Sequence, residues 1–340
     1  MNKHSLRPKG LKRKKIVVIG GGTGTYTVLS GLKKYPVDLA AVVSMTDSGG
    51  SNRVIRDEFG LLPTSDIRQV MVALASDESD EILRKLFTYR YKAGTGISGM
   101  TYGNLFMAAL TDIYGDQEKA IEKTCEILNV QGEILPVTYD NVHLVARYDN
   151  GEQVLGEHFI DEPNERLGKH KIVELEVFPR AKANKKALKT IQDADLIVLG
   201  PGDLHTSIIC NLVVDGVALA IRHSKAKCAY VLNLMTKFGQ TNGFSASEHV
   251  LELEKYLGKG AIDYLLVNSA KIFPNGILKK YREEKAYLVK DDLGGGNGLS
   301  IIRRSFISRR VFEKPKSDKL KRSLIRHDSA KLARAIMSLL

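Results

Sequence analysis

Residues 15–24 read KIVVIGGGTG, and this stretch decides the fold that the rest of the sequence predicts. Four consecutive apolar residues, 16–19, predict a buried strand, and four of the next five residues are glycines. A glycine-rich turn between a strand and a helix lets a phosphate approach the backbone. No Cβ blocks it there, and several N–H groups can face the anion. The stretch therefore makes a nucleotide or another phosphorylated ligand the first hypothesis.

The glycine spacing differs from the dinucleotide fingerprint GxGxxG. That pattern requires a third glycine at position 25 or 27, and threonine stands at both. NAD is therefore kept only as an alternative ligand. A tight turn that needs positive φ and binds nothing is a second alternative.

The composition is that of a globular chain with one large α/β domain or two smaller ones. Of its 340 residues, 43% are hydrophobic and 26% are charged. No apolar run approaches the roughly 20 residues that cross a bilayer, and four apolar residues are too few for a signal peptide. Three widely spaced cysteines argue against a disulfide framework and a zinc knuckle. We expect a cytoplasmic protein without a membrane span.

The positive charge of this chain is concentrated at its two ends. Residues 1–15 hold seven basic and no acidic side chains, and residues 303–340 hold twelve basic and three acidic ones. Because the net charge is +12, the body between them carries −4. This division does not suggest a nucleic-acid groove. We expect a basic arm at residues 1–14 and one α/β domain at 15–340 that includes the basic segment 303–340. Weak RNA or membrane association of the two ends remains an alternative.

Strand-like and helical patterns alternate along most of the chain. This alternation predicts a doubly wound, mainly parallel sheet that is covered on both faces. The strand-like runs are residues 39–43, 196–199, 229–234 and 264–267, and the helical patterns are residues 25–32, 67–75, 81–91, 105–110, 118–128, 213–223 and 246–257. Residues 133–180 break this rhythm with four alternating, strand-like runs at 133–138, 142–148, 154–160 and 172–178. An Asp-Asn-Gly turn at 149–151 supports a hairpin, so we expect a small antiparallel insertion here.

Polar or glycine-rich loops follow several of the predicted strands. Because carboxyl ends of parallel strands meet at one sheet edge, these loops predict one ligand crevice. Asp47 can hold a ribose hydroxyl or Mg²⁺, or it can simply cap the next helix. Asp66 is expected to cap the helix at 67–75, and His205 is a candidate general base. The candidate catalytic residues are Asp47, Asp66 and His205. The candidate binding residues on these loops are Gly49, Gly50, Ser51, Arg68, Asn104, Gly200, Pro201, Gly202 and Asn233.

An ordered set of motifs resembles the family that joins the gluconeogenesis factor YvcK to the 2-phospho-lactate transferase CofD. The motifs are GGGTG (20–24), TDSGGS (46–51), RDEFGLLP…DIR (56–68), SGMTYGNLF (98–106), GEILPVT…NVHL (132–144), GPGDLHTSI…NL (200–212), NLMTKFGQTNGFSASEHV (233–250) and IRHDSAKLA (325–333). The resemblance implies a Rossmann-like fold and a homodimer. It also implies either a UDP-sugar ligand, as in YvcK-type members, or a metal-dependent phospholactyl transfer, as in CofD-type members.

The resemblance assigns roles to individual positions. Gly21, Gly22 and Thr23 match the phosphate turn of the family, and the adjoining Gly24 is a further candidate binding residue. Asp47 and Gly49–Ser51, Gly103–Asn104 and Gly200–Gly202 match further family loops. Tyr281 and Arg326 match the tyrosine and tail arginine that the YvcK branch uses for the nucleotide sugar.

Several acids and one histidine of the family pattern are replaced by neutral residues. Ser48 and Asn242 stand where aspartate is usual, Gln240 where glutamate is usual, and Met100 where histidine is frequent. His205 replaces a tyrosine. Mg²⁺ prefers carboxylate oxygens, so these changes favour binding over transfer chemistry. Asp47 and Asp66 are the remaining candidate metal ligands of a transferase. Together with these replacements, the resemblance implies a regulatory protein that binds a nucleotide sugar such as UDP-N-acetylglucosamine. A Mg-dependent transferase and an NAD-binding protein are the alternatives.

Overall fold

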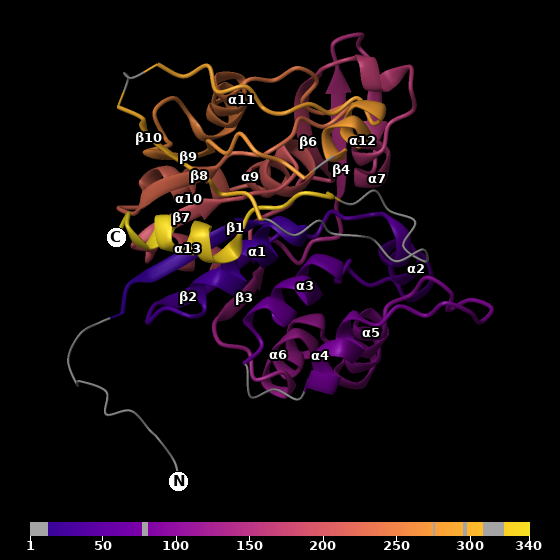
Figure 1. Cartoon of the computed structure of the whole chain (residues 1–340). Coiled ribbons are helices and arrows are strands. Elements are labelled where there is room, and N and C mark those ends of the chain that lie inside the picture. The colour runs from indigo at the N-terminus through magenta and orange to yellow at the C-terminus, as the bar shows by residue number, and fades with distance from the viewer. Residues whose placement is uncertain (1–12, 77–80, 275, 295–297, 309–322) are drawn as a thin grey trace.

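A seven-stranded parallel sheet forms the centre of the molecule (Figure 1). The computed structural model describes residues 13–76, 81–274, 276–294, 298–308 and 323–340. The sheet has the order β10-β9-β8-β7-β1-β2-β3, and every neighbouring pair is parallel. The strands span Lys15–Gly20 (β1), Asp38–Val43 (β2), Glu133–Pro136 (β3), Leu196–Leu199 (β7), Lys227–Val231 (β8), Tyr264–Asn268 (β9) and Ser300–Arg304 (β10).

The order of the strands reverses at β1. The chain adds β2 and β3 on one side of β1, then returns to its other side with β7 and continues outward to β10. Open α/β sheets bind ligands beyond the carboxyl ends of the strands at such a switch point. The glycine cluster that follows β1 and the Gly-Pro-Gly turn that follows β7 therefore face the same crevice.

Helices cover both faces of the sheet, as the alternating patterns predict. One face packs on α1, α3, α5, α6 and α13, and the other on α8, α9, α10, α11 and a second sheet. The helices span Gly22–Leu32 (α1), Gly50–Phe59 (α2), Ser65–Leu74 (α3), Glu81–Thr88 (α4), Tyr102–Tyr114 (α5), Gln117–Ile127 (α6), Glu157–Asp161 (α7), Lys185–Gln192 (α8), Cys210–Leu212 (α9), Val217–His223 (α10), Ala246–Leu257 (α11), Ile277–Glu283 (α12) and Ser329–Met337 (α13). Leu167–Lys169 forms a 3₁₀ turn and Leu204–Ile209 a π-helical turn.

In the described part of the chain, no helix is long and apolar enough to cross a membrane.

The antiparallel insertion has three strands where the sequence predicted four. Its sheet has the order β5-β4-β6, with His143–Tyr148 (β4), Gln153–Leu155 (β5) and Ile172–Phe178 (β6). The first predicted strand is instead β3, which pairs in parallel with β2 and extends the main sheet. The run at 154–160 is also not one strand, because Gly156 (φ +106°) ends β5 and α7 follows. This helix carries acidic side chains to the crevice.

The C-terminal helix α13 lies against α1 (Figure 1). The contact is close because Gly31 has no Cβ, and one added there would overlap the carbonyl group of Ser329. Residues 323–328, which precede α13, consequently lie along the crevice edge. The predicted arm at 1–14 and the basic segment at 303–340 fall partly outside the described residues.

Candidate functional site

Two adjoining pockets lie at the carboxyl edge around the switch point. Their volumes are about 1150 and 1100 Å³, counted out to their open mouths. We call the first the tail pocket, because its walls include Tyr281, Ile325 and Arg326 from the C-terminal part of the chain. We call the second the glycine pocket, because its walls include residues 21–24 and Gly49. Thr23, Gly24 and Gly202 line both pockets, so the two glycine turns lie at the junction between them.

The N-terminus of α1 directs its first backbone N–H groups towards this junction. Its N-cap Gly21 has extended backbone and forms no capping hydrogen bond, and the first turn contains no acidic residue. The first N–H groups of a helix lack intrahelical partners and carry partial positive charge. Helix α2 begins in the same way after Gly49. Both helix starts suit an anionic group.

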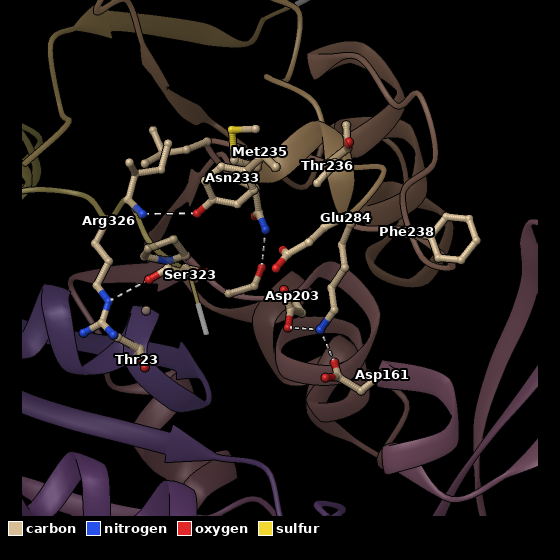
Figure 2. A pocket seen from close by; sticks show the side chains of 18 of the residues that line it. Thr23, Asp161, Asp203, Asn233, Met235, Thr236, Phe238, Glu284, Ser323 and Arg326 are labelled. Carbon is tan, nitrogen blue, oxygen red and sulfur yellow. Dashed lines mark hydrogen bonds and ion pairs between the residues drawn. The ribbon is translucent and has the colours of Figure 1, made fainter. Parts of the chain in front are cut away.

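The tail pocket is closed by a contact between α12 and the C-terminal tail. The hydroxyl of Tyr281 accepts hydrogen bonds from the backbone N–H groups of Leu324 (2.9 Å) and Ile325 (3.1 Å). The Arg326 side chain, whose Nε donates to the Ser323 carbonyl at 3.4 Å, points towards Thr23 at the start of α1 (Figure 2). Asn233 holds the Gly-Pro-Gly turn at 200–202, because its Nδ2 donates to the Gly202 carbonyl at 2.7 Å.

A buried amide organises the base of the glycine pocket. Asn104 is fully buried, accepts a hydrogen bond from Arg68 Nε at 3.0 Å, and donates to the hydroxyls of Ser51 (3.1 Å) and Ser65 (3.0 Å). Arg68 Nη1 also donates to the Phe87 carbonyl at 3.1 Å. Asn104 therefore fixes the starts of α2, α3 and α5 relative to one another.

Asp47 and Glu157 are carboxylates of the glycine pocket with raised pKa values. Burial, with a further contribution from the charge of Asp161, raises the pKa of Asp47. Burial next to Asp47 raises the pKa of Glu157 well above its usual value. Asp47 is held by neutral donors, the Gly49 N–H at 2.8 Å and the Asn52 Nδ2 at 2.5 Å. These bonds form the local turn that the sequence analysis gave as the alternative role of Asp47. Asp47 also lines the glycine pocket.

A lysine pairs with two further carboxylates at the junction. Lys237 Nζ pairs with Asp161 and, at 2.6 Å, with Asp203. Burial opposes ionisation of Asp161, yet the charge and hydrogen bond of Lys237 outweigh it and lower its pKa. Burial raises the pKa of Asp203, which Lys237 offsets in part. The two carboxylates raise the pKa of Lys237, although burial acts against this, so the side chain stays charged.

Most candidate residues from the sequence line these pockets. In the tail pocket they are Thr23, Gly24, Pro201, Gly202, Asn233, Tyr281 and Arg326; in the glycine pocket they are Gly21, Gly22, Thr23, Gly24, Asp47, Gly49, Ser51, Asp66, Arg68 and Gly202. Gly50, Gly200 and Asn104 line neither pocket: Gly50 is exposed, whereas Gly200 and Asn104 are buried. Asp66 lies against Gly21 but does not cap α3, which begins at Ser65 after the N-cap Thr64.

His205 does not line either pocket, contrary to its prediction as a catalytic base. Its side chain is fully buried, and Nε2 lies 3.3 Å from Glu252 Oε1 on α11. The reason is the π-helical turn after Asp203, which directs Thr206 and Ser207 into the glycine pocket and His205 towards α11. The position therefore contributes to the core.

The sequence did not identify Glu157, Asp161 and Lys237 as site residues. The two acids lie on α7, in a stretch whose alternation resembles a strand. Lys237 lies in a polar loop after β8. The position of this loop indicated that it faces the crevice, but nothing in the sequence distinguished Lys237 from its neighbours.

The donor set does not fit the divalent metal that the CofD resemblance implies. Among the described residues, no group of three or more His, Cys, Asp or Glu side chains is arranged to hold a metal ion. Both oxygens of Asp47 already accept hydrogen bonds, and Lys237 bridges Asp161 and Asp203.

Known proteins resemble this chain over nearly its full length. The 2-phospho-L-lactate transferase CofD family matches residues 16–307. A protein of Thermotoga maritima is 43% identical over 95% of this chain and 98% of its own length. The gluconeogenesis factor of Bacillus subtilis is 36% identical over 97% of this chain and 99% of its own length. A crystal structure of a UPF0052 family member from Bacillus halodurans superposes with a TM-score of 0.85, at 35% identity, covering 96% of this chain and 100% of that chain. The expected resemblance and the Rossmann-like parallel sheet are thereby confirmed.

Proposed function

This chain belongs to the CofD/YvcK family, and on that premise we propose that its cleft binds a nucleotide sugar of the UDP-N-acetylglucosamine type. One observation carries the proposal. Arg326 and Tyr281 from the C-terminal part of the chain wall the same pocket as Thr23 and Gly24 from the first glycine turn. A cation facing the N-terminus of a helix suits a phosphate-containing ligand.

The two pockets differ in a way that suits the two halves of such a ligand. Leu234, Met235, Phe238 and Ile325 give the tail pocket apolar walls, which suit a base and its ribose. The junction at Thr23 and the neighbouring turns offers backbone N–H groups to a diphosphate. The glycine pocket beyond it is polar and suits the hydroxyls of a sugar.

We propose a regulatory role for this binding. Relatives named gluconeogenesis factors match the chain over nearly its full length, which supports a role in carbon metabolism. The proposed role in cell shape during growth on gluconeogenic substrates rests on the resemblance to YvcK-type members. The described residues hold no fitting set of metal donors, and His205 lies in the core; both observations favour binding over phospholactyl transfer.

Isothermal titration calorimetry with UDP-N-acetylglucosamine tests the ligand. We expect saturable binding by the wild type and at least about tenfold weaker binding by Arg326→Ala, because a charged hydrogen-bond donor to phosphate is lost. Arg282→Ala is the matched control, since Arg282 is exposed on α12 and does not line the tail pocket. Equal affinity of the wild type and Arg326→Ala contradicts the assigned site.

The same titration separates the alternatives. Saturable binding of NAD without UDP-sugar binding indicates a dinucleotide protein. Turnover of a phospholactyl-nucleotide donor onto a flavin-like acceptor with Mg²⁺ indicates a transferase. The physiological role is tested by complementing a strain that lacks its gluconeogenesis factor with the wild type and Arg326→Ala on gluconeogenic and glycolytic carbon sources.

A further inference from the structure

The junction of the two pockets contains a cation that belongs to the chain itself. Lys237, which follows β8, pairs with Asp161 at the end of α7 and with Asp203 after β7. Figure 2 shows the carboxylates of Asp161 and Asp203 directed into the same small region. Lys237 lines both pockets, and its side chain remains 27% exposed. The ammonium group is therefore both held by the protein and open to a ligand.

One oxygen beside Lys237, Oδ1 of Asp161, is saturated by protein donors. Oδ1 of Asp161 accepts hydrogen bonds from Lys237, from Thr206 Oγ1 at 2.9 Å and from Gln240 Nε2 at 3.0 Å. A carboxylate provides about four lone-pair sites in all, so three donors at one oxygen leave it no further acceptor capacity. Mg²⁺ requires near-octahedral oxygen ligands at short distances. To bind at Asp161 Oδ1, it would have to displace the ammonium group and two neutral donors.

We propose that Lys237 acts as the built-in counter-cation for the phosphates of the ligand, so that this chain binds its anionic ligand without a divalent metal. An ammonium group has three N–H donors, and two of them serve Asp161 and Asp203. The third donor is left for a phosphoryl oxygen at the junction. Without Lys237, the ligand would face two more uncompensated carboxylates next to Asp47 and Glu157. This inference rests on the proposed function for its ligand.

Calorimetry with UDP-N-acetylglucosamine, in EDTA and in millimolar MgCl₂, tests the first consequence. The wild type should bind with the same affinity, within about twofold, in both buffers. Lys237→Gln should lose at least about tenfold in EDTA, because a charged donor is removed and two carboxylates are left unpaired. MgCl₂ should restore part of that loss. Lys237→Arg keeps the charge and should remain insensitive to the metal.

A surface lysine provides the control for the charge change itself. Lys227 pairs with Asp263 and is 60% exposed, and Lys227→Gln should bind as the wild type does in either buffer. A wild type that requires Mg²⁺ overturns the proposal, as does a Lys237→Gln variant that binds normally in EDTA.

Mn²⁺ titration without nucleotide, followed by electron paramagnetic resonance, tests the second consequence. Lys237→Gln should gain a Mn²⁺ site between the freed carboxylates, and the wild type and Lys237→Arg should not. A wild type that binds no nucleotide sugar would refute only the proposed function. The Mn²⁺ titration would still test whether Lys237 excludes a divalent metal, because it uses no nucleotide. Equal Mn²⁺ binding by the wild type and Lys237→Gln overturns the built-in cation.

Discussion

The carbonyl group of Pro201 lies so close to the Cα of Gly24 that a Cβ added at position 24 would overlap it. Gly24 lies in the first turn of α1, and Pro201 follows β7, the strand beside β1 in the sheet. The contact therefore joins the two walls of the cleft at the switch point. The first glycine cluster is needed for this packing as well as for access of a ligand to the backbone.

Replacing Gly24 should weaken the fold although alanine is the better helix former. We expect Gly24→Ala to lower the free energy of unfolding by about 1–3 kcal/mol, because the added methyl group has no room against the Pro201 carbonyl. Urea unfolding measures the change. Gly294→Ala is the control, since no atom lies within 4 Å of a Cβ built at that exposed position. Equal stability of the two variants would contradict the close contact.

Removing the Tyr281 hydroxyl should loosen the tail. In Tyr281→Phe the N–H groups of Leu324 and Ile325 lose their acceptor, which we expect to cost about 1–3 kcal/mol locally. Hydrogen exchange at these two amides should accelerate, and nucleotide-sugar affinity should fall with it. Tyr287→Phe, at a residue that is 53% exposed, is the control. Unchanged exchange at both amides would show that the hydroxyl does not hold the tail.

The parallel sheet and its crevice could be predicted because local sequence determines them. Residues 16–19 are fully buried, as a continuous apolar run in a central parallel strand should be. The glycine loops at 20–24 and 200–202 could be placed together because carboxyl ends of parallel strands share one edge.

The acidic half of the site could not be predicted, since contacts distant in sequence create it. Glu157 reaches the second glycine loop through a hydrogen bond from the Ser48 N–H at 3.4 Å, and Ser48 Oγ accepts from the His158 N–H at 3.1 Å. Alternating polarity at 154–160 suggested a strand, whereas Gly156 ends the strand and begins a helix. The orientation of His205 likewise depends on a π-helical turn without a sequence period of its own.

Shortening Arg68 to lysine should damage the base of the glycine pocket. The guanidinium group donates to Asn104 Oδ1 and to the Phe87 carbonyl from two different nitrogens, a geometry that an ammonium group cannot reproduce. We expect Arg68→Lys to lower the free energy of unfolding by about 1–3 kcal/mol, because buried acceptors lose their donors. Arg53→Lys, at a side chain that is 75% exposed, makes the same exchange on the surface and should stay within about 0.5 kcal/mol of the wild type.

His327 should make stability depend on pH. Burial lowers its pKa from 6.5 to about 4, and its Nε2 has no hydrogen-bond partner among the described residues. Between those two values the unfolded chain binds a proton that the folded chain does not. The stability that His327 contributes is therefore complete above about pH 6.5 and is lost as the pH falls towards 4, by up to about 3 kcal/mol.

His327→Gln should flatten this dependence between pH 6.5 and 4, whatever its effect on stability at neutral pH. Urea unfolding across the range measures the slope. Burial also lowers the pKa of His249, which gives both proteins a shared slope in the same direction, so the difference between them isolates His327. His223→Gln makes the same exchange at an exposed position and should keep the wild-type slope. A slope that is identical in the wild type and His327→Gln would mean that His327 is protonated equally in the folded and unfolded chains, which its burial against the tail pocket argues against.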